Sequence, residues 1–310
     1  DKADVETWHI NVGGMLGRSE GALALWQEYA VSGESEVPPK ARWLTLRANG
    51  GFDLRCSPVL AADILQDCLW SRAAGVIVTS ATITALNSFG RFMLHSGAPE
   101  DARYKAVASP FDYASATFRV PPMDCDPGDA SAHTDALIDL FPSLIDTREG
   151  TLVLFSSRRQ MADVYDGLGS RLGLDVLMQG DYSKQEILRR HREAIDAGEG
   201  SVIFGLASFA EGVDLPGDYC RHVVIAKIPF AVPDSPLEAS LAEWVEAQGR
   251  NPFMEISVPD AALRLVQASG RLLRTEQDTG RVTLMDRRVL TRRYGKAILD
   301  SLPPFRRELG

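Results

Sequence analysis

The chain has 310 residues, of which 45% are hydrophobic, and its formal net charge is −9. This length suits one large or two ordinary globular domains, and the acidic balance argues against electrostatic DNA binding over the whole surface while leaving room for a local basic groove. No window approaches ~18 uninterrupted apolar residues, and the segment after Asp1 lacks the regions of a secretion signal. We therefore expect a cytoplasmic protein with no membrane partner.

The first part of the chain predicts a helix, a linker and a hairpin. Residues 22–30 form an amphipathic stretch, and residues 32–40 have the polar composition of a linker. Two alternating runs, 42–46 and 52–56, flank Asn49-Gly50-Gly51, which is the pattern of a β-hairpin.

A helix and a strand are expected next. Ser57-Pro58 is expected to cap a helix that carries Leu60, Ile64 and Leu69. That helix would lead into the apolar run 76–78, which predicts a buried strand ending in a hydroxyl-rich turn.

From residue 105 onward, short apolar runs alternate with amphipathic helices. The runs lie at 106–108, 152–155, 175–178, 202–204, 223–226 and 282–285. One helix is expected at 159–172, and another opens at Ser183 with Glu186 as the second member of a capping box. This alternation predicts an α/β fold with a parallel sheet flanked by helices and right-handed crossovers. Residues 229–259 contain five prolines and interrupt the pattern, so we expect an insertion with a helix at 237–247.

The strongest chemical signal is the run Gln267-Ala268-Ser269-Gly270-Arg271-Leu272-Leu273-Arg274. Two arginines three residues apart on a helix project from the same face, and guanidinium groups bind phosphate oxygens in a planar fork. Gln267 can donate to the same anion, and Gly270 allows a close backbone approach. The run suits a γ-phosphate in transfer; a solvated basic helix face is the alternative.

Three other segments place polar residues where a strand is expected to end. Such ends lie at the edge where parallel sheets bind ligands. The segments are 76–83 with Ser80 and Thr82, 152–158 with Ser156, Ser157 and Arg158, and 204–218 with Ser208, Glu211, Gly212 and Asp214.

In this order the segments resemble superfamily 2 DNA helicases of the DinG/XPD type. The resemblance runs from about Ser57 to Pro304 and rests on 79–82, 153–161, 179–181, 208–218, 267–274 and the closing run 286–296. Enzymes of this family are ATP-driven DNA helicases that translocate 5′ to 3′, and many carry an iron–sulfur cluster. The resemblance implies that residues 1–98 are the end of a first motor domain with the tail of its helical arch. Residues 99–310 would be the second, RecA-like motor domain.

The resemblance also assigns roles. Arg271, Arg274 and Gln267 would act on ATP, with Gly270, Glu211, Gly212 and Asp214 beside the nucleotide. Ser156, Ser157, Arg158 and Ser208 would bind single-stranded or forked DNA, and Ser80 and Thr82 would couple the two sites. For Ser80 and Thr82 the alternative is a plain turn at a strand end, and for the 208–218 segment it is a cluster of caps and turns without ligand contact; Arg158 could equally pair with an acid.

Further candidates come from composition alone. Other basic residues that could line a groove are Arg159, Arg189, Arg190, Arg192, Arg287, Arg288, Arg292, Arg293 and Lys296, although solvated helix faces explain most of them equally well. The aromatic side chains of Phe111, Tyr113, Phe230 and Trp244 could stack on bases, but we expect them to pack in a core or an interface.

Metal sites are not expected in this chain. The cysteines Cys56, Cys68, Cys125 and Cys220 have no metal-site spacing, and the five histidines are scattered. An iron–sulfur cluster is therefore expected only in a longer protein, if at all.

Two motifs of a complete motor are absent from the sequence. It contains no G-x-x-x-x-G-K-[ST] P-loop and no Asp-Glu-x-His box for Mg²⁺. We therefore expect a monomeric C-terminal part of a longer helicase that needs its other half to use ATP and Mg²⁺, and that does not hydrolyse ATP alone. The alternative is a non-catalytic module that binds single-stranded DNA or a protein partner. A metabolic α/β enzyme is disfavoured, because neither a G-x-G-x-x-G fingerprint nor a G-x-S-x-G elbow occurs.

Overall fold

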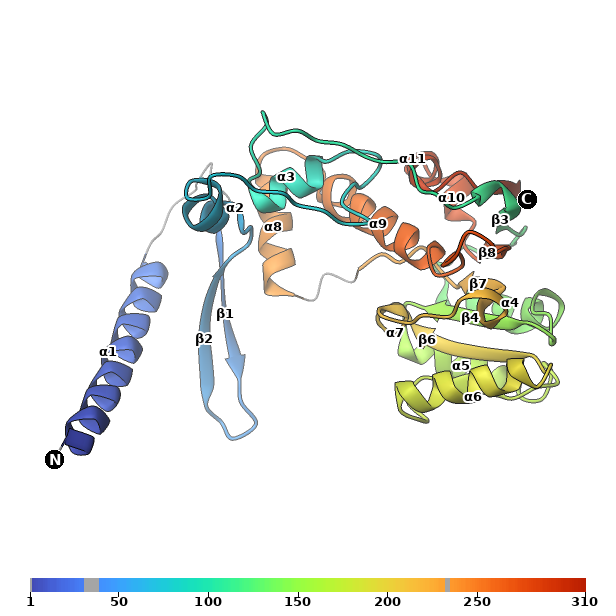
Figure 1. The fold of residues 1–310 in the computed structure, drawn as a ribbon, viewed down its shortest axis with the longest axis horizontal. Coiled ribbons are helices and arrows are strands. Elements are labelled where there is room, and N and C mark those ends of the chain that lie inside the picture. The colour runs from blue at the N-terminus through green and yellow to red at the C-terminus, as the bar shows by residue number, and fades with distance from the viewer. Residues whose placement is uncertain (1, 31–38, 232–234) are drawn as a thin grey trace. The chain divides into compact units, whose positions relative to one another are not determined.

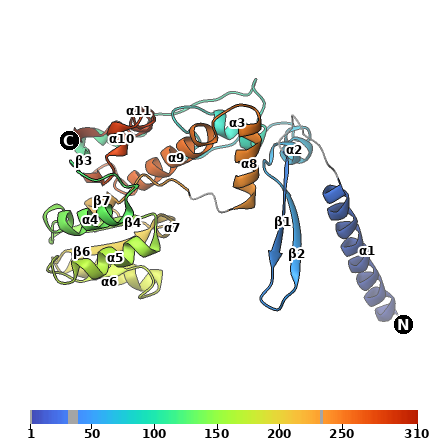
Figure 2. The same ribbon diagram turned by 180° about the vertical axis from the view of Figure 1, so that it is seen from behind.

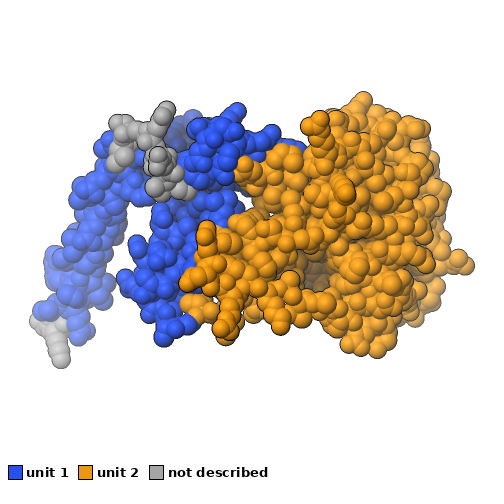
Figure 3. Space-filling model, turned by 90° about the horizontal axis from the view of Figure 1, so that it is seen from above, with its two compact units in different colours: residues 1–75, 94–99, 232–253 blue, residues 76–93, 100–231, 254–310 orange. Residues whose placement is uncertain are grey.

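The computed structural model describes residues 2–30, 39–231 and 235–310. The chain forms two compact units, coloured separately in Figure 3. We call residues 1–75, 94–99 and 232–253 the hairpin unit, and residues 76–93, 100–231 and 254–310 the sheet unit. These boundaries differ from a division at residue 98, and the assignment of 1–98 and 99–310 to two motor domains stays a prediction. Most of the expected linker, at 31–38, lies outside the described residues.

The hairpin unit contains the predicted hairpin. Its elements are α1 (Lys2–Ala30), β1 (Lys40–Leu46), β2 (Phe52–Pro58), α2 (Ala62–Leu65), the π-helical turn η1 (Gln66–Trp70) and α8 (Pro236–Ala247), labelled in Figure 1 except for η1. Strands β1 and β2 are antiparallel with Leu46 opposite Phe52. The turn between them needs Gly50, whose φ of +81° is a conformation that glycine adopts without strain. The hairpin and the helix at 237–247 are confirmed.

The expected cap at Ser57-Pro58 is wrong. Both residues belong to β2, where Ser57 lies opposite Ala41 and Pro58 opposite Lys40. Pairing with β1 therefore keeps these residues in the strand. The helix begins only at Ala62, and the preceding Ala61 has no side chain that could cap it.

The sheet unit is built around seven strands that pair only in parallel. They are β3 (Ala116–Val120), β4 (Gly150–Phe155), β5 (Val176–Met178), β6 (Ser201–Leu206), β7 (His222–Ile225), β8 (Gly280–Leu284) and β9 (Arg306–Leu309). Their order across the sheet is β5-β6-β4-β7-β8-β3-β9. Because the pairs are all parallel, every carboxyl end lies at one edge, which we call the carboxyl edge.

Helices flank this sheet. The α-helices of this part are α3 (Gly90–Ser96, shared between the units), α4 (Ala130–Leu144), α5 (Arg158–Leu168), α6 (Lys184–Asp196), α7 (Ala207–Ala210), α9 (Val258–Ser269), α10 (Arg288–Thr291) and α11 (Gly295–Ser301). Shorter turns are η2 (Tyr113–Ser115), η3 (Gly217–Cys220) and η4 (Phe253–Ser257). Figures 1 and 2 show β4, β6 and β7 next to α4, α5 and α6 from two sides.

Alternating strand residues bury two cores. In β4, Leu152 and Leu154 pack in a cluster with residues of α6, α9 and α11, whereas Val153 and Phe155 pack in a second cluster with residues of α4 and α5. Period-two alternation sends successive side chains to opposite faces of a sheet. The result is the three-layer, RecA-like α/β architecture that the sequence predicted.

Local capping matches the helix starts. Ser157 Oγ accepts a 3.3 Å hydrogen bond from the Gln160 backbone N–H, and Ser183 Oγ accepts one of the same length from that of Glu186. These bonds satisfy amide groups that a helix start otherwise leaves unpaired. The Glu186 carboxylate binds Arg189 and Arg190.

Two expected strands are wrong. Residues 76–79 have no regular secondary structure, and Ile77 is 95% exposed. Residues 106–108 are also irregular, and Val107 is exposed. A strand must find a partner for its backbone groups, and neither segment pairs with a described strand. The strands β3 and β9 were not predicted.

Candidate functional site

A cavity in the sheet unit gathers most of the predicted nucleotide-side residues. Its volume is about 810 Å³. Predicted site residues that line it are Ser80, Thr82, Glu211, Gln267, Gly270, Arg271 and Arg274. These residues come from three segments far apart in the sequence, which the fold brings to one place.

The two arginines converge on one backbone oxygen. Arg271 Nη1 lies 3.4 Å from Val213 O, and Arg274 Nη2 donates to the same oxygen at 2.6 Å. The expectation that both arginines lie on a helix is wrong, because α9 ends at Ser269 and both follow in a turn. Leu272 and Leu273 are buried in the core. They anchor this turn, so that Arg271 before them and Arg274 after them face the cavity.

The charge around these guanidiniums is only partly matched. Arg274 Nε lies 3.7 Å from Asp214 Oδ1, yet it is buried and has no hydrogen-bond partner among the described residues. Burial, and then the neighbouring Arg274, lower the pKa of Arg271, although a guanidinium keeps its charge in proteins. Two adjacent cations with an unused donor favour an anion with several oxygens, and the terminal phosphates of a nucleotide fit this description.

Gln267 connects the arginine segment to the hydroxyl-rich turn. Gln267 Nε2 donates a 3.1 Å hydrogen bond to Thr82 Oγ1. Ser80 Oγ in turn accepts from the Thr82 backbone N–H at 3.2 Å, which holds the turn. Thr82 and Gln267, to which the sequence assigned separate roles, are thus in direct contact.

The segment 208–218 contains a predicted DNA-binding residue, Ser208, and also contacts the cavity with the two arginines. Ser208 lies in α7 directly after β6, Glu211 lines the cavity, and the carbonyl of Val213 receives both arginines. Gly212 has a φ of +68°, a conformation that glycine adopts without strain, so a tight turn forms there. Asp214 lies outside the cavity lining, with its side chain 74% exposed.

One buried carboxylate of this region was missed by the sequence reasoning. Asp278 is 6% exposed and joins the turn after Arg274 to Gly217. Its signal in the sequence is only a Thr275-x-x-Asp278 spacing just before a strand, which is common in turns.

The predicted DNA-binding residues lie elsewhere, at the carboxyl edge. Phe155 and Leu206 are register partners at the ends of β4 and β6, so Ser156 and Ser157 follow one strand and Ser208 follows its neighbour. All three serines are exposed, as is Arg158, which begins α5. Ser157 also serves as the cap of α5 through its hydrogen bond from the Gln160 backbone N–H. No carboxylate among the described residues pairs with Arg158.

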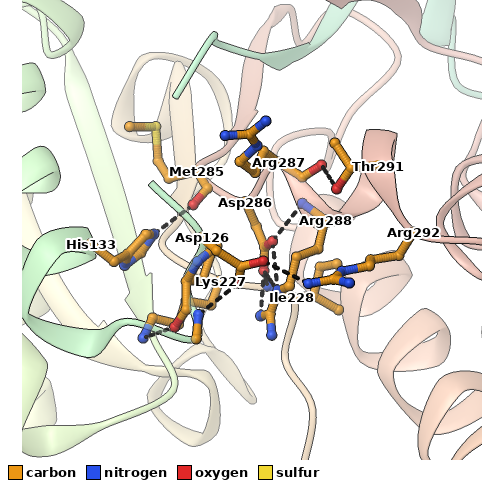
Figure 4. A network of polar contacts seen from close by, with 12 residues as sticks. Asp126, His133, Lys227, Ile228, Met285, Asp286, Arg287, Arg288, Thr291 and Arg292 are labelled. Atoms are coloured by element: carbon orange, nitrogen blue, oxygen red, sulfur yellow. Dashed lines mark hydrogen bonds and ion pairs between the residues drawn. The ribbon is translucent and has the colours of Figure 1, made fainter. Parts of the chain in front are cut away.

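Most other basic candidates are already paired. Arg189 contacts the carboxylates of Glu186 and Glu193, and Arg190 contacts Glu186. Figure 4 shows the cluster after β7 and β8, where fully buried Asp286 accepts from the Ile228 backbone N–H at 2.9 Å and from Arg288 Nη2 at 2.7 Å.

The rest of that cluster is also bonded internally. Arg292 pairs with Asp126 at 2.8 Å, and Arg287 donates to Asp124 O at 3.3 Å. These contacts favour the structural interpretation for Arg287, Arg288 and Arg292.

Three of the four aromatic candidates, Phe111, Tyr113 and Phe230, pack against other rings. Tyr113 makes an edge contact with Phe305 at 5.0 Å between ring centroids and one with Phe111 at 6.3 Å. Phe230 packs edge-on against Tyr294 at 5.6 Å. In the hairpin unit, the Arg250 guanidinium lies 5.5 Å from the Trp244 ring.

Metal ligands do not gather in the described residues. Across 2–30, 39–231 and 235–310, no group of three or more His, Cys, Asp or Glu side chains could hold a metal ion. In the same ranges, no helix combines the length and the apolar composition needed to cross a bilayer.

Comparison with known proteins places the chain among helicases. A family described as "Helicase C-terminal domain" matches residues 142–305, more than half of the chain. Over 300 residues, the chain is 43% identical to the ATP-dependent DNA helicase DinG of Photobacterium profundum and 36% identical to that of Escherichia coli K12. These alignments cover 94% of this chain but only 43% and 42% of the relatives, so the chain spans less than half of their length.

A solved structure shares the fold. The structure of S. tokodaii Xpd4 has a TM-score of 0.55 at 16% identity, over 84% of this chain and 50% of that one. At this identity the likeness concerns the fold alone.

Proposed function

Because the chain belongs to the helicase C-terminal domain family, we propose that it is the C-terminal motor part of an ATP-dependent DNA helicase of the DinG type. The observation that carries this proposal is the convergence of Arg271 and Arg274 on one cavity that also contains Gln267. Residues 99–310 would be the second motor domain, and residues 1–98 the end of the first.

In this proposal the two guanidiniums bind the terminal phosphates of ATP held by the other motor half. Charge that develops on the transferred phosphoryl group is stabilised by donors that are already in place. Gly270 and Glu211, which line the cavity, lie beside the nucleotide, and Gly212 shapes the turn that carries Val213. Asp214 holds Arg274 from the rim.

Neither Mg²⁺ nor an iron–sulfur cluster has a ligand set among the residues that the structure describes. The described residues gather no set of three metal-ligating side chains. We therefore assign no step to a metal on this side of the site, and metal binding would belong to other parts of a longer protein.

DNA would lie along the carboxyl edge of the sheet. Exposed hydroxyls and the backbone amides at the start of α5 suit the phosphates of single-stranded or forked DNA. Ser156, Ser157, Arg158 and Ser208 would make these contacts while the motor moves 5′ to 3′.

Coupling between ATP and DNA would use two connections. The segment 208–218 links Ser208 at the carboxyl edge to the carbonyl that receives both arginines. The hydrogen bond from Gln267 to Thr82 links the arginine segment to the turn that also contains Ser80. A change at the phosphates would thereby reach the DNA contacts. A cytoplasmic, monomeric state remains part of the proposal.

The test compares two polypeptides in one phosphate-release assay. A longer protein that adds the P-loop-bearing half should hydrolyse ATP and should be stimulated by single-stranded DNA. The 310-residue chain alone should release phosphate at the background rate, because one wall of the site is missing. Robust DNA-stimulated turnover by the chain alone, or none by the longer protein, would overturn the proposal.

A further inference from the structure

Asp278 receives hydrogen bonds from two loops at once. Its Oδ2 accepts from the backbone N–H of Arg274 at 2.7 Å and of Thr275 at 2.9 Å. Its Oδ1 accepts from Thr275 Oγ1 at 2.6 Å and from the backbone N–H of Gly217 at 3.1 Å. Gly217 lies 61 residues away in the sequence, so this carboxylate joins the arginine turn to the end of the 208–218 segment.

Only a carboxylate satisfies this arrangement. Four donors point at two oxygens, and an ionised Asp accepts on both, whereas an Asn side chain offers one accepting oxygen and adds two donors of its own. The side chain is almost fully buried, so water does not readily replace a lost partner, and a buried donor left without an acceptor is costly.

The same two loops are joined a second time through the Arg274 side chain. Arg274 Nη2 donates to Val213 O, four residues before Gly217, while the Arg274 backbone N–H donates to Asp278. Both ends of Arg274 are therefore tied to the segment 208–218. A displacement at Asp278 shifts the base of the side chain relative to its tip, and misplacement by about 1 Å in a catalytic arrangement can reduce a rate ~100-fold.

We infer that Asp278 is a positioning residue: its carboxylate holds the turn at 274–275 against Gly217 and thereby sets where the Arg274 guanidinium lies during ATP hydrolysis. The inference rests on the proposed function. Asp278 itself does not line the cavity, so it acts through Arg274 and touches no substrate.

A double-mutant cycle in the longer, two-part protein tests it. The variants are Asp278→Asn, Arg274→Ala and the combination, and the readout is kcat for DNA-stimulated ATP hydrolysis. Asp278→Asn should lower kcat ~10-fold or more, and Arg274→Ala ~100-fold or more. In the Arg274→Ala background, Asp278→Asn should change kcat less than ~2-fold, because the group that it positions is gone. Asp175→Asn, an exposed acid elsewhere in the unit, is the matched control and should leave kcat unchanged.

The outcomes that would contradict the inference distinguish a failure of the positioning role of Asp278 from a failure of the role of Arg274. Equal losses from Asp278→Asn in both backgrounds would overturn the positioning role and leave the proposed function standing. A wild-type rate in Arg274→Ala would overturn the role of Arg274, and this inference with it.

A more conservative variant keeps the inference testable if Asp278→Asn does not fold. If thermal unfolding shows that Asp278→Asn is unfolded at the assay temperature, Thr275→Val enters the same cycle, because it removes one of the two donors to Oδ1 and leaves the carboxylate in place. We expect a ~2–5-fold lower kcat with Arg274 present, in line with one hydrogen bond, and no further loss without it. The same loss in both backgrounds would overturn the inference.

Discussion

Gln267 Nε2 donates a 3.1 Å hydrogen bond to Thr82 Oγ1 across 185 residues of sequence. Both side chains line the cavity that contains Arg271 and Arg274. The contact therefore connects a turn near the start of the sheet unit to the segment with the strongest chemical signal in the sequence.

Removing the Thr82 hydroxyl should weaken the coupling between ATP hydrolysis and DNA binding. In the two-part protein, Thr82→Val should lower DNA-stimulated ATP hydrolysis by ~3–10-fold, the range of one lost hydrogen bond that leaves a donor unpaired. Gln267→Ala should add little to Thr82→Val if the two act through this bond. Steady-state phosphate release measures both, and independent, multiplicative losses would contradict coupling through the pair.

Ser208 should matter more for DNA than for ATP. Its side chain is exposed beside the end of β6, next to Ser156 at the end of β4. Ser208→Ala should weaken single-stranded DNA binding by ~3–10-fold with little change in the KM for ATP. Fluorescence anisotropy with labelled oligonucleotides measures the affinity. Ser170→Ala, at an exposed turn after α5, is the control, and a larger effect on ATP than on DNA would reassign the segment 208–218.

Arg189 should be dispensable for DNA binding. Its guanidinium is held by Glu186 and Glu193. Hydrogen bonds from Arg189, and then from Arg190, lower the pKa of Glu186 to about 2. Arg189→Ala should leave the affinity for single-stranded DNA and its salt dependence unchanged. A decrease of the salt slope by about one would instead show a phosphate contact.

Mild acid should destabilise the protein through His222. Burial, with smaller effects of Arg281 and Arg119, lowers the pKa of His222 to about 3. The unfolded chain therefore takes up a proton near pH 6.5, and the folded protein does so only near pH 3. The stability that this neutral histidine contributes is present above pH 6.5 and is lost as the pH falls toward 3.

At pH 5 the loss from this one group should be about 2 kcal/mol relative to pH 7. Urea unfolding of the wild type and of His222→Gln at both pH values measures it. The variant should show a smaller difference between the two pH values, because Gln does not titrate. An unchanged difference would mean that His222 is not the group responsible.

The elements that the sequence predicted correctly are those that a local pattern of residues determines. Asn49-Gly50-Gly51 predicted the hairpin, because few residue types adopt the positive φ that its turn needs. The central strands β4, β6 and β7 are continuous apolar runs buried on both faces, which is typical of parallel sheets.

The wrong predictions concern segments whose structure depends on contacts with residues distant in the sequence. The run 76–78 has strand composition, but no described strand pairs with it. Strand β9, with exposed Arg306 and Arg307, is an edge strand, so it lacks the apolar signal that revealed the others. Sequence spacing placed Arg271 and Arg274 on a helix, whereas burial of Leu272 and Leu273 turns the chain after Ser269.

The site was predicted as a set of residues but not as a geometry. Gln267, Arg271 and Arg274 were identified by residue type and order, and they do meet in one cavity. The carbonyl of Val213 and the carboxylate of Asp278 hold these side chains, and neither has a sequence signature, because backbone oxygens and turn carboxylates occur everywhere.

The most direct test of the account is the rate of ATP hydrolysis by the two-part protein with Arg271→Ala. Arg264→Ala, on the preceding helix α9 and outside the cavity lining, is the matched control. We predict that Arg271→Ala lowers kcat at least ~100-fold, while Arg264→Ala stays within ~2-fold of the wild type. A kcat for Arg271→Ala that equals that of the control would contradict the assignment of this guanidinium to the phosphates of ATP.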